Sequence, residues 1–110
     1  MSQDPRGHLD LLLLAVLQPG PVHGYAAIAA LRDRSDGAFD LAEGTVYPAL
    51  HKLERAGLVA SRWTDGGGRR RRVYELTSAG AAALAARRQE WGRFASSVQA
   101  VLGPRPMWAA

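Results

Sequence analysis

The chain of 110 residues contains no cysteine, which excludes disulfide bonds, zinc sites built on thiolates and a catalytic thiol. No apolar run approaches the ~20 residues that a membrane-spanning helix needs. The sequence does not open with a charged segment, an apolar stretch and a cleavage site. From these absences we expect a cytoplasmic protein that does not act at a membrane.

Lysine is nearly absent as well, because Lys52 is the only one beside 13 arginines, a ratio typical of a GC-rich bacterial genome. The net charge is +4 and the isoelectric point about 10.3, which favours anionic partners such as nucleic acid. Hydrophobic residues make up 47% of the chain, as in globular domains. We expect a single small domain with little stability in reserve, which dimerisation would increase.

Hydrophobic periodicity predicts four helices and one hairpin. In order, these are helices over residues 8–18, 23–34 and 43–56, strands over 58–65 and 71–77 joined by a basic tip, and a helix over 78–102. In the second helix, Tyr25, Ile28, Ala29 and Leu31 are expected to face inward, and Gly57 is expected to end the third. The predicted fold class is α+β, mainly α with a small β-hairpin. It is a winged helix-turn-helix with a long C-terminal helix.

The third predicted helix lies in the segment EGTVYPALHKLERAGLV, Glu43 to Val59. Its apolar stripe is Val46, Leu50 and Leu53, and the opposite face is small around Pro48 and becomes basic further on. Small residues would let this face approach a DNA groove closely. The candidate DNA contacts are Thr45 and Tyr47 for base edges or phosphates, and His51, Lys52 and Arg55 for the backbone. An ordinary solvated helix face is the alternative interpretation.

The expected wing tip, GGGRRRR, places four consecutive arginines beside three glycines. The candidate phosphate contacts are therefore Arg69, Arg70, Arg71 and Arg72, because arginine binds phosphate through two parallel hydrogen bonds. A solvated charged loop is the alternative. Since four adjacent like charges repel one another, we favour a polyanionic partner.

The last predicted helix carries an apolar stripe that approximates a coiled-coil seam. Its members, the expected dimer interface, are Leu84, Trp91, Phe94, Val98 and Val101. Packing of the helix back on its own domain is the alternative. Trp91 is either plain interface core or a residue that stacks on a ligand. We therefore divide the chain into a DNA-binding domain (1–77), a dimerisation helix of the same compact unit (78–103) and a tail (104–110).

Nothing in the sequence supports catalysis. The three histidines (His8, His23 and His51) are scattered, and no metalloprotease, nucleophile-elbow or phosphate-loop motif is present. We expect no enzyme activity, no metal and no cofactor.

Three segments together resemble PadR-type transcriptional regulators: LLLLAVLQPGPVHGYAAIAAL, EGTVYPALHKLERAGLV and GGGRRRRVYELTSAG. The resemblance covers about residues 9–91. It implies a cytoplasmic homodimer that binds a roughly palindromic double-stranded DNA operator, commonly as a repressor. It also implies Thr45, Tyr47, Lys52 and the wing arginines as DNA contacts.

In the smaller branch of that family the single last helix makes the dimer, and a small aromatic effector often relieves repression. Trp91 matches the place of a ligand-stacking tryptophan in multidrug-sensing relatives. Asp10 and Leu11 would face the same slot. The stiff link QPGP and the apolar Ala95 depart from the family pattern and leave the effector open.

Two other functions remain as rivals. One is a winged-helix adaptor that contacts a protein partner, with the basic tip incidental. The other is a sensor of apolar ligands whose output is not DNA binding.

Overall fold

The computed structural model describes residues 8–104. In chain order the elements are α1 (Leu9–Leu17), β1 (Val22–His23), α2 (Gly24–Arg34), α3 (Glu43–Arg55), β2 (Val59–Gly66), β3 (Arg69–Leu76) and α4 (Ser78–Leu102). The predicted α+β class is confirmed, and each predicted helix boundary lies within one residue of the observed one. The predicted tail lies outside the described residues except for Pro104, as do residues 1–7.

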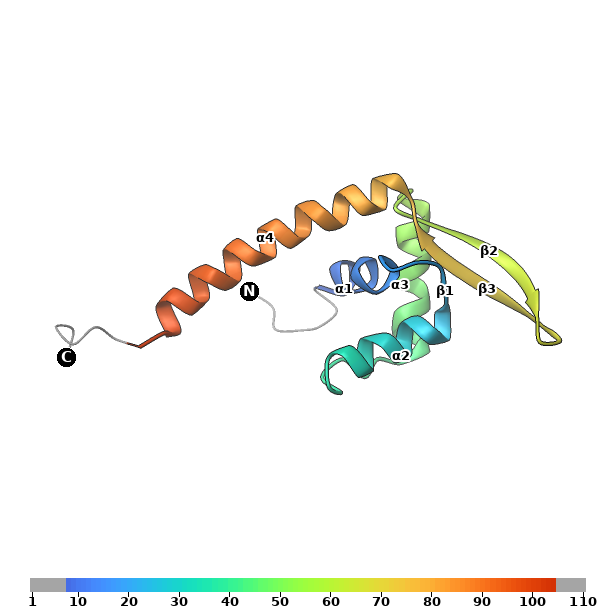
Figure 1. Ribbon diagram of the computed structural model, residues 1–110, viewed down its shortest axis with the longest axis horizontal. Coiled ribbons are helices and arrows are strands. Elements are labelled where there is room, and N and C mark those ends of the chain that lie inside the picture. Colours follow the sequence, from blue (N-terminus) through green and yellow to red (C-terminus); the bar gives the residue numbers. More distant parts are fainter. Residues whose placement is uncertain (1–7, 105–110) are drawn as a thin grey trace.

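Helix α1 lies at the centre of the body, below α4 and against α2 and α3 (Figure 1). It is made almost entirely of Leu, Ala and Val, so it can bury side chains on all sides. Leu13, Leu14 and Leu17 are at most 1% exposed. This confirms the buried helix expected from the sequence. No helix among residues 8–104 is long and apolar enough to cross a bilayer.

Helix α2 corrects one expectation, because Tyr25 does not face inward. The buried residues of its core face are Ala27 and Leu31, four positions apart. Tyr25 precedes Ala27 by two positions, about 200° around the helix, and its side chain is 67% exposed. It therefore lies on the outer surface at the start of α2.

Helix α3 has the predicted inner stripe, since Val46, Leu50 and Leu53 are all buried. The helix ends as expected at Gly57, which has a left-handed φ of 79°. The N–H of Leu58 donates to the carbonyl of Leu53 at 3.0 Å, a bond typical of a glycine-ended helix. The opposite face of α3 is left for solvent or a partner.

The sheet has three antiparallel strands in the order β1-β3-β2. Strand β1 was not predicted, because two residues are too few to show any periodicity; it pairs Val22 with Tyr74 and His23 with Val73. The hairpin turn is also tighter than predicted. Only Gly67 and Gly68 form it, both with positive φ, as a two-residue turn between twisted strands requires.

The short turn corrects the expected loop over residues 66–70. Arg69 and Arg70 belong to β3, where Arg69 pairs with Gly66 and Arg70 with Asp65. Successive residues of a strand point to opposite faces. The four wing arginines are therefore divided between the two faces of the hairpin.

Helix α4 begins where the sequence predicts, with the Thr77 hydroxyl accepting from the Gly80 N–H at 3.0 Å. Its first turns pack on the body, and Leu84 is 1% exposed. This corrects the expected dimer stripe, because Leu84 is a core residue of its own chain. Beyond it, α4 extends past the body on the side away from the wing (Figure 1). Its 25 residues correspond to about 37 Å.

Candidate nucleic-acid interface

The wing and the starts of two helices enclose an open hollow of about 910 Å³. Its walls come from three parts of the chain: His23, Gly24, Tyr25 and Ala26 at the start of α2; Tyr47 and His51 on α3; and Trp63, Arg69, Arg70, Arg71, Arg72 and Tyr74 on the hairpin. The hollow combines aromatic and cationic side chains. Such a surface suits a phosphate backbone and the base edges beside it.

Of the five candidates on α3, the hollow brings together Tyr47 and His51. Thr45 is partly buried, whereas Lys52 and Arg55 are exposed outside the lining. The Tyr47 ring packs on Gly24, where an added Cβ would stand 2.6 Å from Cζ of the ring. Gly24 therefore allows the Tyr47 ring to pack against the start of α2, because it has no Cβ.

Two tyrosines of this surface keep their protons at neutral pH. Burial raises the pKa of Tyr47, and the Glu43 carboxylate raises it further. The same carboxylate, by hydrogen bonding and by its charge, raises the pKa of Tyr25. A protonated phenol has one hydrogen to donate. The Tyr25 hydroxyl donates it to the Glu43 carboxylate, whereas the Tyr47 hydroxyl can donate to phosphate or to a base acceptor.

The wing arginines have different surroundings. Arg69, Arg70 and Arg71 are exposed. Arg70 and Arg72 share a face of the hairpin with Trp63, since Trp63 pairs with Arg72 across the strands. Their Cζ atoms lie 4.9 and 5.4 Å from the centroid of the indole, within the range of cation–π attraction.

Arg72 differs from the other three because its side chain is already engaged. Its Nε donates to Ser61 Oγ at 3.0 Å, and its Nη2 lies 3.6 Å from Glu54 Oε2 on α3. The sequence placed it among the phosphate ligands. The structure shows it linking the wing to α3.

Three side chains of this region are not predicted from the sequence. Tyr25 was expected inside, Trp63 was treated only as a strand residue, and Glu54 was not singled out. Alternation along β2 and β3 is the signal that could have placed Trp63 beside two arginines. The contact of Glu54 with the wing needs the tertiary structure.

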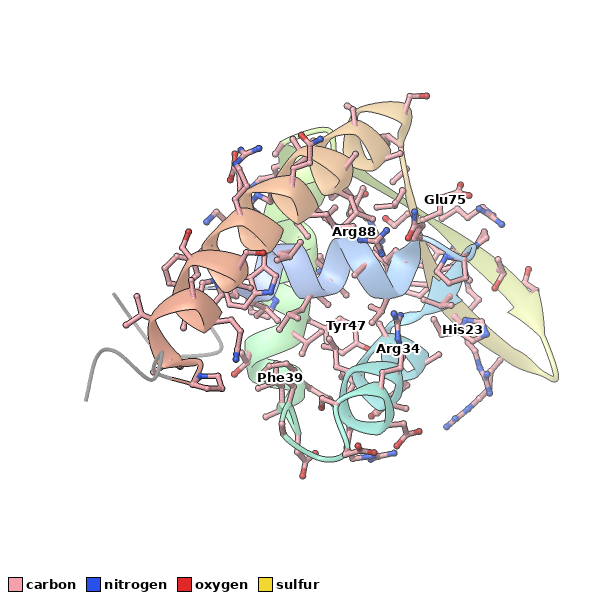
Figure 2. The ribbon with its side chains drawn as sticks, turned by 60° about the vertical axis from the view of Figure 1, so that its left-hand side comes forward. His23, Arg34, Phe39, Tyr47, Glu75 and Arg88 are labelled. Carbon is pink, nitrogen blue, oxygen red and sulfur yellow. The ribbon has the colours of Figure 1, made fainter. Side chains whose placement is uncertain are left out.

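A second hollow, an open groove of about 490 Å³, lies between α1 and α4. Its lining residues are His8, Leu11, Leu12, Ala15, Phe39, Arg88 and Trp91, and Figure 2 shows Arg88 on the side of α4 that faces α1. Two of the three residues predicted for an effector, Leu11 and Trp91, therefore line the same groove. Asp10 is outside the lining and pairs with Arg87 at 3.9 Å.

The rest of the predicted dimer stripe lies along the part of α4 that follows Leu84. Trp91 is 45% exposed, Val98 37% and Val101 84%, and Leu102 adds to them at 73%. Phe94 is partly buried against the Trp91 ring, with a centroid distance of 5.7 Å. A helix with so many exposed apolar side chains has surface to bury against a partner.

Comparison with known proteins gives a consistent result. Residues 13–86 match the model of the transcriptional regulator PadR-like family. The transcriptional regulator Rv3488 of Mycobacterium tuberculosis is 38% identical over 84 residues, which cover 76% of each chain.

Solved structures agree. A PadR family transcription regulator from Clostridium difficile R20291 superposes with a TM-score of 0.77 at 35% identity, covering 88% of this chain and all of that one. A transcriptional regulator from Clostridium thermocellum gives a TM-score of 0.82 at 26% identity, covering 94% and 99%. The chain therefore belongs to the PadR-like family of transcriptional regulators, which are winged-helix DNA-binding proteins and not enzymes.

Proposed function

We propose that the protein is a homodimeric repressor that binds a roughly palindromic operator near its own gene, in the cytoplasm of a bacterium. The observation that carries the proposal is the hollow that joins Tyr47 and His51 of α3 to the wing arginines. A recognition helix would enter the major groove while the wing meets the neighbouring phosphates. A protein placed there would exclude RNA polymerase from an overlapping promoter.

The exposed stripe of α4 supports dimerisation. Its side chains Trp91, Phe94, Val98 and Val101 would pack against the same residues of a second copy around a two-fold axis. The dimer would present two α3 helices to successive major grooves, about 34–36 Å apart. Palindromic half-sites would match this symmetry.

Hydroxyl-radical footprinting on DNA from the region upstream of the gene tests the proposal, with duplexes selected from a random library as a second substrate. We expect two protected blocks whose centres lie one helical turn, ~10 base pairs, or a multiple of it apart. A single protected block would contradict the dimer. Selection that enriches no sequence would contradict operator binding and favour a protein adaptor.

We further propose that a small aromatic effector binds in the groove that Leu11, Phe39 and Trp91 line. A planar ligand would stack on Trp91 at the junction of the body and α4 and change the distance between the two recognition helices. We expect planar aromatic compounds to quench the fluorescence of the parent and not of Trp91→Phe, which corrects for Trp63 and Trp108. Ligand binding that leaves operator affinity unchanged would favour a sensor without DNA output.

A further inference from the structure

One carboxylate ties the wing to the recognition helix. Glu54 lies on the last turn of α3, and its Oε2 accepts a hydrogen bond of 2.6 Å from Ser61 Oγ on β2. Ser61 Oγ in turn accepts from Arg72 Nε on β3 at 3.0 Å. The Arg72 guanidinium returns to Glu54 with Nη2 at 3.6 Å from the same Oε2. The three side chains close a triangle over three elements.

Solvent access is limited in this triangle. The side chains of Arg72 and Glu54 are 35% and 30% exposed, less than those of Arg62 and Glu75, a second ion pair of the hairpin, at 53% and 40%. Partial burial reduces screening, and a hydroxyl shared between two charges orders both. The triangle is therefore a firmer link than an isolated surface pair, which contributes little.

The link reaches the side chains that line the hollow. Arg72 packs on the Trp63 ring, and Arg70 packs on the same ring. Next along the same face, the buried Tyr74 has its hydroxyl 3.4 Å from His51 Nε2 on α3. A change in the position of Arg72 would move Trp63 and Arg70 relative to α3.

We propose that Glu54 is a positioning residue for DNA binding, which through Ser61 and Arg72 fixes the angle between the wing and α3. Helix α3 and the wing can then contact the DNA major groove and the phosphate backbone at the same time. No conformational entropy is lost in ordering the wing during binding. The inference rests on the proposed use of α3 and the wing as the DNA interface. Glu54 itself contacts no DNA in this arrangement.

The direction in which Glu54→Ala changes operator affinity distinguishes a positioning role from an effect of charge alone. Glu54→Ala and Glu75→Ala each remove one negative charge from the same region, and charge alone would tighten DNA binding in both. The Glu75 pair joins only the two wing strands, through Arg62 Nη1 at 2.9 Å. We expect Glu54→Ala to weaken operator binding roughly three- to tenfold, whereas Glu75→Ala leaves it unchanged or tighter.

Ser61→Ala is the neutral variant, because it breaks the triangle without changing the charge. We expect Ser61→Ala to weaken operator binding, as Glu54→Ala does. We also expect Ser61→Ala to fold, so that it tests the inference even if Glu54→Ala does not fold. Operator affinity of Glu54→Ala and Ser61→Ala equal to or tighter than that of the parent overturns the inference.

Amide hydrogen exchange gives a readout that general destabilisation would not reproduce. We expect Glu54→Ala to speed exchange in β2 and β3 while exchange in α1 and α4 stays as in the parent. Equal acceleration in all four elements would assign Glu54 a purely structural role and overturn the inference.

Tyr47→Ala separates this inference from the proposed function. If it weakens operator binding while Glu54→Ala does not, only the positioning role is wrong. If neither substitution weakens operator binding, the proposed interface is wrong and the positioning role with it.

Discussion

Replacing Arg69, Arg70 and Arg71 together with alanine should weaken operator binding by about 10²- to 10³-fold near 100 mM salt. These three arginines are exposed and line the hollow beside α3. In a dimer the change removes six cations. For every phosphate contact that is lost, the slope of log affinity against log salt concentration should become shallower by about one unit. Fluorescence anisotropy of a labelled operator over a salt series measures both quantities.

A matched control removes the same charge elsewhere. Arg32, Arg34 and Arg93 are exposed and lie outside the lining of the hollow. Their triple replacement by alanine should change operator affinity only a few-fold, through the net charge. Equal losses in the two triple variants would show that overall charge, rather than the wing, binds the DNA.

Gly80→Ala should lower the free energy of unfolding by about 2–3 kcal/mol. The Cβ of an alanine at this position would collide with the backbone carbonyl oxygen of Leu58, which cannot swing aside as a side chain can. That carbonyl also accepts the Thr77 N–H at 3.1 Å, so α4 cannot retreat without loosening its own start. Alanine's higher helix propensity returns only about 1 kcal/mol. Urea denaturation at fixed protein concentration measures the loss.

Gly92→Ala is the control within the same helix. Apart from its chain neighbours and the backbone of its own helix turns, no heavy atom of the described residues lies within 4 Å of the place where its Cβ would stand. Position 92 also lies away from the apolar stripe of α4. We expect a gain of up to about 1 kcal/mol from helix propensity. A Gly80→Ala variant as stable as the parent would contradict the close contact between α4 and Leu58.

The sequence was sufficient to predict the positions of the helices, because each helix has a clear local signal. Gly57 and Thr77 mark where α3 ends and α4 begins, and the stripe of Val46, Leu50 and Leu53 gives α3 its orientation. The strand β1 has no such signal. Its two residues form a strand by pairing with Tyr74 and Val73 of β3, which lie some 50 positions later in the chain.

The site was predicted less completely, since its parts meet only in three dimensions. Tyr47 and the wing arginines could be named from motifs and charge. The engagement of Arg72 depends on Glu54, 18 positions earlier in the chain, and periodicity carries no information on such a pair. Leu84 was misassigned for a related reason: a helical stripe gives the apolar side of α4, but not the point at which α4 leaves its own core.

The most direct test of DNA recognition by α3 and the wing is a salt titration of the parent protein. Operator DNA and a random duplex of equal length should be compared between 50 and 200 mM salt. With ~6–10 phosphate contacts per dimer, operator affinity should fall about 10³- to 10⁵-fold over this range while staying well above that for random DNA. Affinity that is independent of salt, or equal for both duplexes, would contradict the account.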